Sequence, residues 1–434
     1  MASAEARCDN VNETTWARHR RTNRWRMRDP GLVPVLVVCL VTLISGYALK
    51  AICPPQDAST YPTLCYTDVT ALYGARGLDI GVLPYLDFPA EGSYQDPGFL
   101  EYPVVTGAFI AALSAISDSA ADFLRVNALL LGAVALLSAA ALRRLAGWLV
   151  MRWAAAPILA LYAFNNWDLL AVGCVVAGCF MQARARAGWA GLWFGLGMAA
   201  KLYPVFFLAP LLVERLWAGD SRGAARAVAG GMAAFLLPNL LLALANPAGW
   251  WATYSFHSAR GADLGSLWGV LLPVETGTAT VNVLSALTML IGGASVLGIG
   301  WWRAVREQAY PFVPVASALV IVFLLTSKVA SPQYALWLLP SLVLLQLRLR
   351  WWVAWNAVGV LVYLVSFGVG LAGYRYDMAP DGIAVAAVAR ALVLGGLLVV
   401  VLRAPEVFRP RRRGEVRQDG EGRPQAGGFA VPHV

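Results

Sequence analysis

The feature that most constrains this sequence is a succession of apolar runs separated by short segments that carry arginine. An apolar run of about 20 residues is long enough to cross a lipid bilayer as an α-helix. The first run, residues 32–52, follows an arginine-rich head and lacks a convincing cleavage site, so we predict a retained signal anchor. With 59% hydrophobic and only 14% charged residues, the chain of 434 residues has the composition of an integral membrane protein.

Hydropathy and loop charge together predict twelve membrane spans, with both termini in the cytoplasm. Hydropathy by itself allows about eleven to thirteen spans, because several runs are short or contain proline. With the N-terminus inside, the arginines of the short loops all face the cytoplasm, as the positive-inside rule requires. The predicted spans are 32–52, 123–142, 150–164, 167–182, 188–200, 203–217, 224–245, 279–300, 312–326, 334–347, 351–372 and 383–402.

This topology predicts an all-α polytopic membrane protein in three parts. Residues 1–31 form a basic cytoplasmic head, residues 32–403 the membrane domain, and residues 404–434 a disordered cytoplasmic tail rich in arginine, glycine and proline. Two long external loops are expected at 53–122 and 246–278. The first loop holds juxtamembrane or re-entrant helices, since residues 101–117 must not cross the membrane if the arginines are to stay inside.

The long first loop also holds two cysteines and most of the external carboxylates. Cys53 and Cys65 lie where an oxidising compartment permits a disulfide. Asp68 precedes a helix-like stretch, and a carboxylate among aromatic residues can act as a general base, although an N-cap role explains it equally well. Asp96 lies in a turn-like QDPG sequence. The alternative carboxylates are Asp57, Asp79, Asp87 and Glu101.

Lys201 is a lone lysine between two predicted spans, where Pro204 prevents one continuous helix. It either reaches the interface as a snorkelling side chain or meets the anionic head group of a lipid. His257, Arg260 and Lys328 lie at similar positions. The simpler explanation is snorkelling or pairing with a carboxylate for Arg260 and Lys328, and a hydrogen-bonded interfacial imidazole for His257. With three histidines and no metal-binding spacing in the chain, we predict neither a metal nor another cofactor.

Four short motifs resemble the GT-C superfamily of integral membrane glycosyltransferases. They are YP at 102–103, NWDLLAV at 166–172, AKLYPVFFLAPLL at 200–212 and SPQYALWLLP at 331–340. Within that superfamily the chain is most similar to the actinobacterial polyprenyl-phosphate-mannose-dependent α-mannosyltransferase family. The resemblance covers most of residues 32–403, and one departure is Val104, where many relatives have a second proline.

The resemblance implies a GT-C-like bundle that transfers a sugar with inversion, at the outer face of the plasma membrane. The donor would be a polyprenyl-phosphate sugar, with mannose expected and a pentose such as arabinose left open. The acceptor would be a glycolipid or lipoglycan hydroxyl. Membrane lipids are the other expected partners, and nucleic acid is not expected.

The same resemblance assigns roles to particular residues. Asp68 would be the general base. The donor phosphate would be bound by Lys201, His257, Arg260 and Lys328. The substrates would contact Glu101, Tyr102, Asp168, Tyr203, Gln333 and Tyr334.

Two other classes of function remain compatible with the sequence. A twelve-span transporter has the same layout, but transporters carry ionisable residues near the middle of their spans, whereas here Arg390 is almost alone. A catalytically inactive lipid-binding scaffold would have the same composition, and only turnover distinguishes it from an enzyme.

Overall fold

The computed structural model describes residues 31–52, 64–368 and 379–407, and the regular elements of these residues are helices. An isolated antiparallel bridge joins Leu345 and Glu406. The all-α part of the predicted fold class is therefore confirmed. Residues 1–30 of the predicted head, residues 408–434 of the predicted tail, and Cys53 and Asp57 lie outside the described residues.

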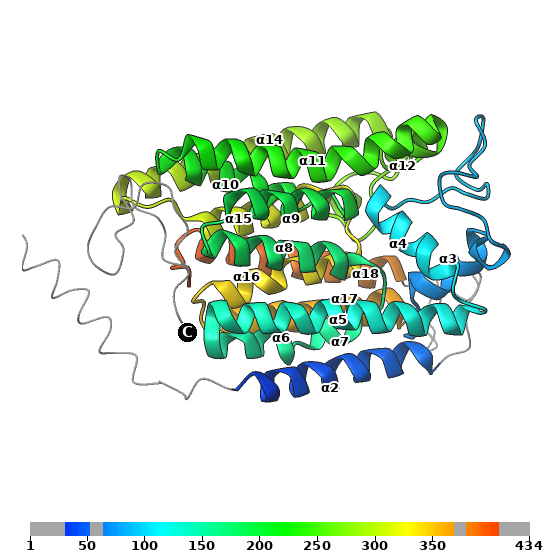
Figure 1. The fold of residues 1–434 in the computed structure, drawn as a ribbon, viewed down its shortest axis with the longest axis horizontal. Helices are drawn as coiled ribbons and strands as arrows, with labels where there is room; N and C mark the ends of the chain where they lie inside the picture. The colour runs from blue at the N-terminus through cyan, green and yellow to red at the C-terminus, as the bar shows by residue number, and fades with distance from the viewer. Residues whose placement is uncertain (1–30, 53–63, 369–378, 408–434) are drawn as a thin grey trace, which may run out of the picture.

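The long helices lie side by side in an elongated bundle, with α2 at one edge and α11 and α14 at the opposite edge (Figure 1). In chain order, the first half contains α2 (Leu32–Ala51), α3 (Asp68–Ala75), η2 (Leu78–Ile80), α4 (Val104–Ser114), α5 (Ala120–Ala146), η3 (Gly147–Val150), α6 (Met151–Ala154), α7 (Pro157–Tyr162), α8 (Asp168–Ala183) and α9 (Ala187–Ala200). The second half contains α10 (Val205–Trp217), α11 (Ser221–Ala245), α12 (Pro247–Ala259), α13 (Leu267–Leu271), α14 (Thr278–Glu307), α15 (Phe312–Thr326), η4 (Pro332–Leu338), α16 (Leu339–Leu344), α17 (Leu349–Phe367) and α18 (Ala379–Val401).

Six helical segments of the described chain are long and apolar enough to cross a membrane, judged by length and composition. They are α2, the continuous stretch Ala120–Ala154 that contains α5, and α11, α14, α17 and α18. The other predicted ranges hold shorter or interrupted helices. For example, 150–164 contains α6 and α7, and 334–347 contains η4 and α16. The membrane class is supported, whereas the count of twelve spans stays a prediction.

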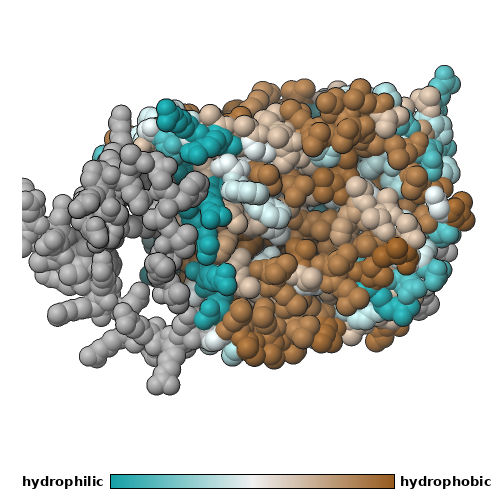
Figure 2. Space-filling view, viewed as in Figure 1, coloured by the Kyte–Doolittle hydropathy of each residue, from teal (hydrophilic) through white to brown (hydrophobic). Residues whose placement is uncertain are grey.

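On the face seen in Figure 2, a broad hydrophobic band crosses the middle of the bundle and separates two hydrophilic ends. The band runs across the helix axes and includes exposed apolar side chains such as Leu244 on α11 and Leu290 on α14. A soluble monomer rarely exposes so large a continuous apolar surface, which instead suits contact with lipid.

Glycines bring α9 and α11 into close contact. Gly191 and Gly195 lie one helical turn apart on α9, and a Cβ atom at either position would lie 2.0 Å from a carbonyl oxygen of α11. The two oxygens belong to Ala227 and Gly231. Because only a hydrogen fits there, the backbones of the two helices touch directly, as in small-residue packing of membrane helices.

The predicted topology requires that residues 101–117 do not cross the membrane. The helix in this segment is α4, which has 11 residues. Such a helix is about 16 Å long, far shorter than the hydrocarbon core. Figure 1 places α3, α4 and α12 at the same end of the bundle. Thr106 of α4 donates a hydrogen bond to the carbonyl oxygen of Ala200 at 2.8 Å, so α4 lies against the end of α9.

Candidate functional site

Asp68 is the first residue of α3 and its side chain points to Tyr102 rather than to its own helix. The helix is capped by Thr67, whose hydroxyl oxygen accepts from the Val69 amide, so the N-cap explanation for Asp68 is wrong. The Tyr102 hydroxyl donates to Asp68 Oδ2 at 2.7 Å. Because the cap is provided by its neighbour, the Asp68 carboxylate is free for another role.

The surroundings of Asp68 raise its pKa from 3.8 to about 6. Burial is the largest cause, and the negative charge of Glu101 adds to it. Hydrogen bonds from Tyr102 and Tyr66 and the positive charge of Lys201 act in the opposite direction. A carboxylate with this pKa is ionised at neutral pH and is a stronger base than an ordinary aspartate, as general base catalysis requires.

Lys201 lies at the junction of α9 and α10 and forms an ion pair with Asp168. The distance from Lys201 Nζ to Asp168 Oδ1 is 2.9 Å, and Trp337 Nε1 donates to Asp168 Oδ2 at 2.9 Å. The Asp168 side chain is 1% exposed, whereas that of Lys201 is 18% exposed. Asp168 therefore lies behind the lysine and fixes its position, and the predicted direct contact of Asp168 with substrate stays a prediction.

The ammonium of Lys201 also faces two aromatic rings, with centroids at 5.0 Å for Tyr102 and 5.4 Å for Tyr334. Burial disfavours its charge, but Asp168 and Tyr334 outweigh that cost and raise the pKa of Lys201. Among the described residues Asp168 is the one ion-pair partner of Lys201, and a lysine has three donors. Lys201 therefore keeps donors for an external anion. Asp68, Tyr102, Asp168 and Lys201 together are called the carboxylate centre below.

Stacked aromatic side chains form the wall behind the carboxylate centre. Tyr203 and Tyr334 both stack on Trp337, with ring centroids 4.3 Å and 3.9 Å away. Gln333 is buried beside Tyr334 in η4. The predicted substrate residues Tyr203, Gln333 and Tyr334 are therefore brought to one place, but mainly as packed side chains.

Glu101 lies beside the carboxylate centre and joins it to Arg76 and His257. Arg76 Nη2 is 3.0 Å from Glu101 Oε2, and His257 Nε2 lies 2.8 Å from the Glu101 carbonyl oxygen. Since that oxygen can only accept, Nε2 carries the proton. Desolvation is the largest cause that lowers the pKa of His257, and Lys201 and Arg260 lower it further. At neutral pH His257 is therefore a neutral hydrogen-bonding group rather than a cation.

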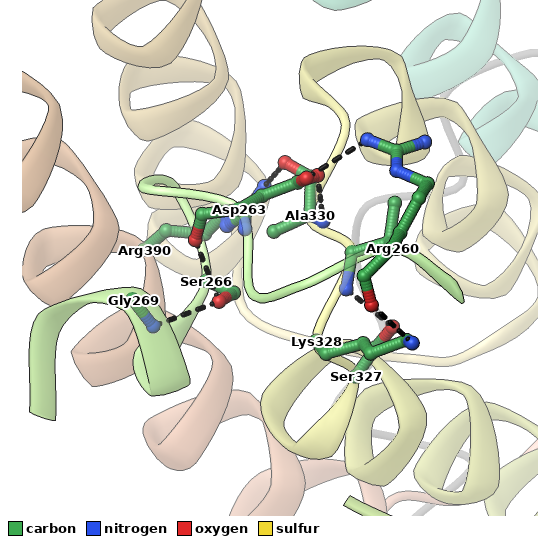
Figure 3. Close-up of polar contacts among 9 residues, drawn as sticks. Arg260, Asp263, Ser266, Gly269, Ser327, Lys328, Ala330 and Arg390 are labelled. Carbon is green, nitrogen blue, oxygen red and sulfur yellow. Dashed lines mark hydrogen bonds and ion pairs between the residues drawn. The ribbon is translucent and has the colours of Figure 1, made fainter. Parts of the chain in front are cut away.

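A second polar group lies at the end of the bundle that contains α3, α4 and α12. It is called the loop clamp below and contains Arg260, Asp263, Lys328, Ala330 and Arg390 (Figure 3). Asp263 Oδ1 is 2.8 Å from Arg260 Nη2, and Asp263 Oδ2 accepts from the Ala330 amide at 3.1 Å. The Asp263 amide in turn donates to the Lys328 carbonyl at 2.8 Å. The loop after α12 is thereby joined to the segment between α15 and η4.

Arg390 and Lys328 complete the loop clamp with bonds to neutral oxygens. Arg390, in α18, donates to the carbonyls of Ala330 at 3.1 Å and Gly265 at 2.8 Å (Figure 3). Lys328 Nζ donates to the carbonyls of Ser258 and Arg260 and to Asn282 Oδ1. These three bonds use every donor of the Lys328 ammonium. The predicted phosphate contact of Lys328 stays a prediction, and in this structure Lys328 fastens the loop.

Three residues of the site were missing from the predicted set: Lys50, Arg76 and Trp337. Trp337 lies inside the SPQYALWLLP motif, but the motif does not show which of its residues belong to the site. Lys50 is an ionisable residue within the first apolar run, a feature that marks functional sites in membrane proteins.

Among the other predictions, Asp96 accepts from the Ser93 amide at 2.5 Å, which confirms its turn role. Cys65 is disulfide-bonded, while its predicted partner Cys53 lies outside the described residues. Within the described ranges, no three histidine, cysteine or acidic side chains are grouped so that they could hold a metal ion.

A protein-family model matches the chain. The model of glycosyltransferase family 87 matches residues 99–332, more than half of the chain. The matched segment contains Tyr102, Asp168, Lys201 and both sides of the loop clamp except Arg390, and begins after Asp68. Comparison with curated proteins finds no match.

Proposed function

The chain belongs to glycosyltransferase family 87, and on this premise we propose that it transfers a sugar from a polyprenyl-phosphate donor to a hydroxyl of a glycolipid or lipoglycan. Mannose is the proposed sugar, on the resemblance of the four motifs. The observation that supports this reaction best is the carboxylate centre, where a base with a raised pKa lies beside a lysine that has unused donors. Family membership also favours an enzyme over a transporter or an inactive scaffold.

In the proposed reaction, Asp68 removes the proton from the acceptor hydroxyl as its oxygen attacks the anomeric carbon. The bond from that carbon to the phosphate oxygen breaks, and the polyprenyl phosphate leaves with the bonding electron pair. A single displacement of this kind inverts the anomeric configuration. Tyr102 holds one Asp68 oxygen at 2.7 Å, which orients the carboxylate toward the acceptor.

Negative charge develops on the departing phosphate and must be stabilised. Lys201 supplies a fixed positive charge there, because Asp168 and two tyrosine rings hold its ammonium in place. Arg260 is the second proposed phosphate ligand, since its side chain is one-third exposed and uses Nη2 for Asp263. In this scheme His257 contributes a hydrogen bond, and Lys328 holds the Arg260 carbonyl.

We place the reaction on the external face. Arg152 and Arg303 bond to the carbonyls of Leu347 and Leu402 at the end of the bundle opposite to α3 and α4. The positive-inside rule assigns that arginine-bearing end to the cytoplasm, so the carboxylate centre faces outward.

Labelling of intact cells tests this orientation. Ser258→Cys, exposed beside the loop clamp, should react with a membrane-impermeant maleimide added from outside. The matched control is Arg222→Cys, exposed at the start of α11, which should react only after the cells are permeabilised. The reverse pattern would place the site in the cytoplasm.

Transfer by the purified protein tests the reaction itself. We expect radiolabelled mannose to move from polyprenyl-phosphate-mannose to a membrane glycolipid with inversion, and Asp68→Asn to abolish that transfer. A parallel assay with polyprenyl-phosphate-arabinose tests the sugar. Transfer of arabinose alone would show that arabinose, not mannose, is the transferred sugar. Transfer from a nucleotide sugar alone would overturn the proposal of a lipid-phosphate donor.

A further inference from the structure

A buried lysine is bonded to the segment that leads into Asp68. Lys50, near the end of α2, is 3% exposed. Its Nζ donates to the Tyr66 carbonyl at 2.6 Å, to Tyr363 Oη at 2.9 Å and to Asn165 Oδ1 at 3.0 Å. The ammonium therefore uses all three donors, and each acceptor is neutral.

Two of these three acceptors connect Lys50 to the backbone at Asp68 and just before it. Tyr66 precedes Asp68 by two residues, and its carbonyl is held by Lys50. The carbonyl of Asn165 accepts from the Asp68 amide at 2.9 Å, while the side chain of the same asparagine accepts from Lys50. The lysine thus fixes the segment that carries Asp68 to the loop that leads into α8.

The charge of Lys50 is unusual for its surroundings. The rings of Tyr363 and Phe367 lie 4.9 Å and 5.7 Å from Nζ, and Tyr66 stacks on Phe367 at 5.5 Å. An apolar side chain would fill such a site without the cost of desolvating an ammonium. The carboxylate whose charge favours the ammonium here is that of Asp68.

We propose that Lys50 is a positioning residue for Asp68: it fixes the backbone that holds Asp68 against Tyr102, and it places an ammonium on the α2 side of the carboxylate. The inference rests on the proposed function for its catalytic consequence, but not for its effect on Asp68. The other groups that act on Asp68 are Tyr66 and Tyr102, which donate hydrogen bonds, and the charges of Glu101 and Lys201. Asp68 favours the charged form of Lys50, and because the attraction between two charges is mutual, Lys50 in turn favours the ionised form of Asp68.

The test compares variants that keep or remove this charge. Lys50→Gln keeps two N–H donors and loses the charge, and Lys50→Met loses both. Tyr363→Phe keeps the ammonium and removes one of its acceptors. Thr42→Val is the packing control, because it removes another bond from α2, the one that Thr42 donates to the Ala154 carbonyl at 2.7 Å.

Two measurements are made on each purified variant in detergent. The first is the pH midpoint for labelling of Asp68 by a carbodiimide, quantified by peptide mass spectrometry, which needs no catalytic activity. The second is sugar transfer as a function of pH. For Lys50→Gln and Lys50→Met we expect both midpoints to rise by about one pH unit, because loss of a nearby positive charge favours the neutral acid. Tyr363→Phe and Thr42→Val should leave the midpoints unchanged.

Unshifted midpoints in folded Lys50→Gln overturn the inference, and so does the loss of folded protein in both lysine variants, which would assign Lys50 to the scaffold alone. If the wild type transfers no sugar, the proposed function fails, while the labelling midpoint still decides the effect of Lys50 on Asp68. A shifted labelling midpoint without a shifted transfer profile would show that Asp68 is not the base and would overturn the catalytic role of Lys50.

Discussion

Lys201 and Lys328 have similar positions in the sequence but opposite surroundings in the structure. Each follows the end of a helix at the same end of the bundle. Lys201 faces one buried carboxylate and two ring faces, whereas Lys328 donates to three neutral oxygens of the chain. The difference teaches that a cation at a membrane interface becomes a binding group only where its donors are left unused.

The same contrast separates the carboxylate centre from the loop clamp as a whole. In the carboxylate centre, charged groups meet aromatic rings and a tyrosine hydroxyl, so part of their bonding capacity faces outward. In the loop clamp, Asp263 and Arg390 are used to connect backbone segments. We therefore expect substitutions in the carboxylate centre to change turnover, and substitutions of Asp263, Lys328 or Arg390 in the loop clamp to change mainly stability.

The largest expected effect belongs to Asp68→Asn. Asparagine keeps the size of the side chain and can still meet Tyr102, but it cannot accept the acceptor proton. We expect the transfer rate to fall by about 10²- to 10⁴-fold, the usual contribution of a general base. The control is Asp79→Asn, an exposed carboxylate close by in the chain, which should transfer at the wild-type rate. Equal rates for the two variants would move the base to another residue.

Lys201→Met tests the charge of the carboxylate centre, but the single substitution leaves Asp168 buried without its partner. Breaking a buried pair in this way costs about 3–5 kcal/mol, so the thermal midpoint in detergent should fall. The double variant Lys201→Met/Asp168→Asn should recover most of that stability and still transfer sugar about 10²-fold more slowly than wild type. Recovery of both properties would make the pair structural.

The pH dependence of transfer sharpens the assignment of Asp68. Its pKa of about 6 means that the carboxylate is protonated, and unable to accept a proton, at lower pH. We expect kcat/KM to fall about tenfold for each unit below pH 6 and to level off above it. The residual activity of Asp68→Asn should not show this decrease below pH 6. If the variant shows the same decrease, another group is responsible for it.

The smallest effect on turnover is expected for Lys328→Met. Removal of the ammonium leaves the carbonyl of Arg260 and Asn282 Oδ1 without this donor. The free energy of unfolding should fall by about 1–3 kcal/mol, measured by denaturation in detergent. The transfer rate should fall far less than in Lys201→Met. A larger loss of kcat than in the Lys201 variant would show that Lys328 contacts the donor directly.

The sequence was sufficient to predict the helices but not the partners of the charged residues. Long apolar runs predicted α2, α11, α14 and α17, because a helix that faces lipid must be apolar along its length. Pro204 correctly located Lys201 at a helix junction. The pairing of Lys201 with Asp168, however, depends on how α8 packs against α9, and local pattern contains no information about that packing.

The role of Asp68 could not be decided from the sequence either, although here the two alternatives are adjacent residues. In the sequence, both Thr67 and Asp68 are good N-cap residues, and only the structure shows that Thr67 takes the cap and frees the carboxylate. Lys50 was missed because its partners, Asn165 and Tyr363, come from distant parts of the chain.

The glycine contact between α9 and α11 has a consequence for biogenesis. With 14 residues, α9 is about 21 Å long, shorter than the hydrocarbon core of a bilayer. Two of its glycines, Gly191 and Gly195, pack against α11, which is synthesised later. We therefore expect α9 to take its final position only after α11 has been synthesised. In a nascent chain that ends before α11, Lys201 would not yet lie at its final depth.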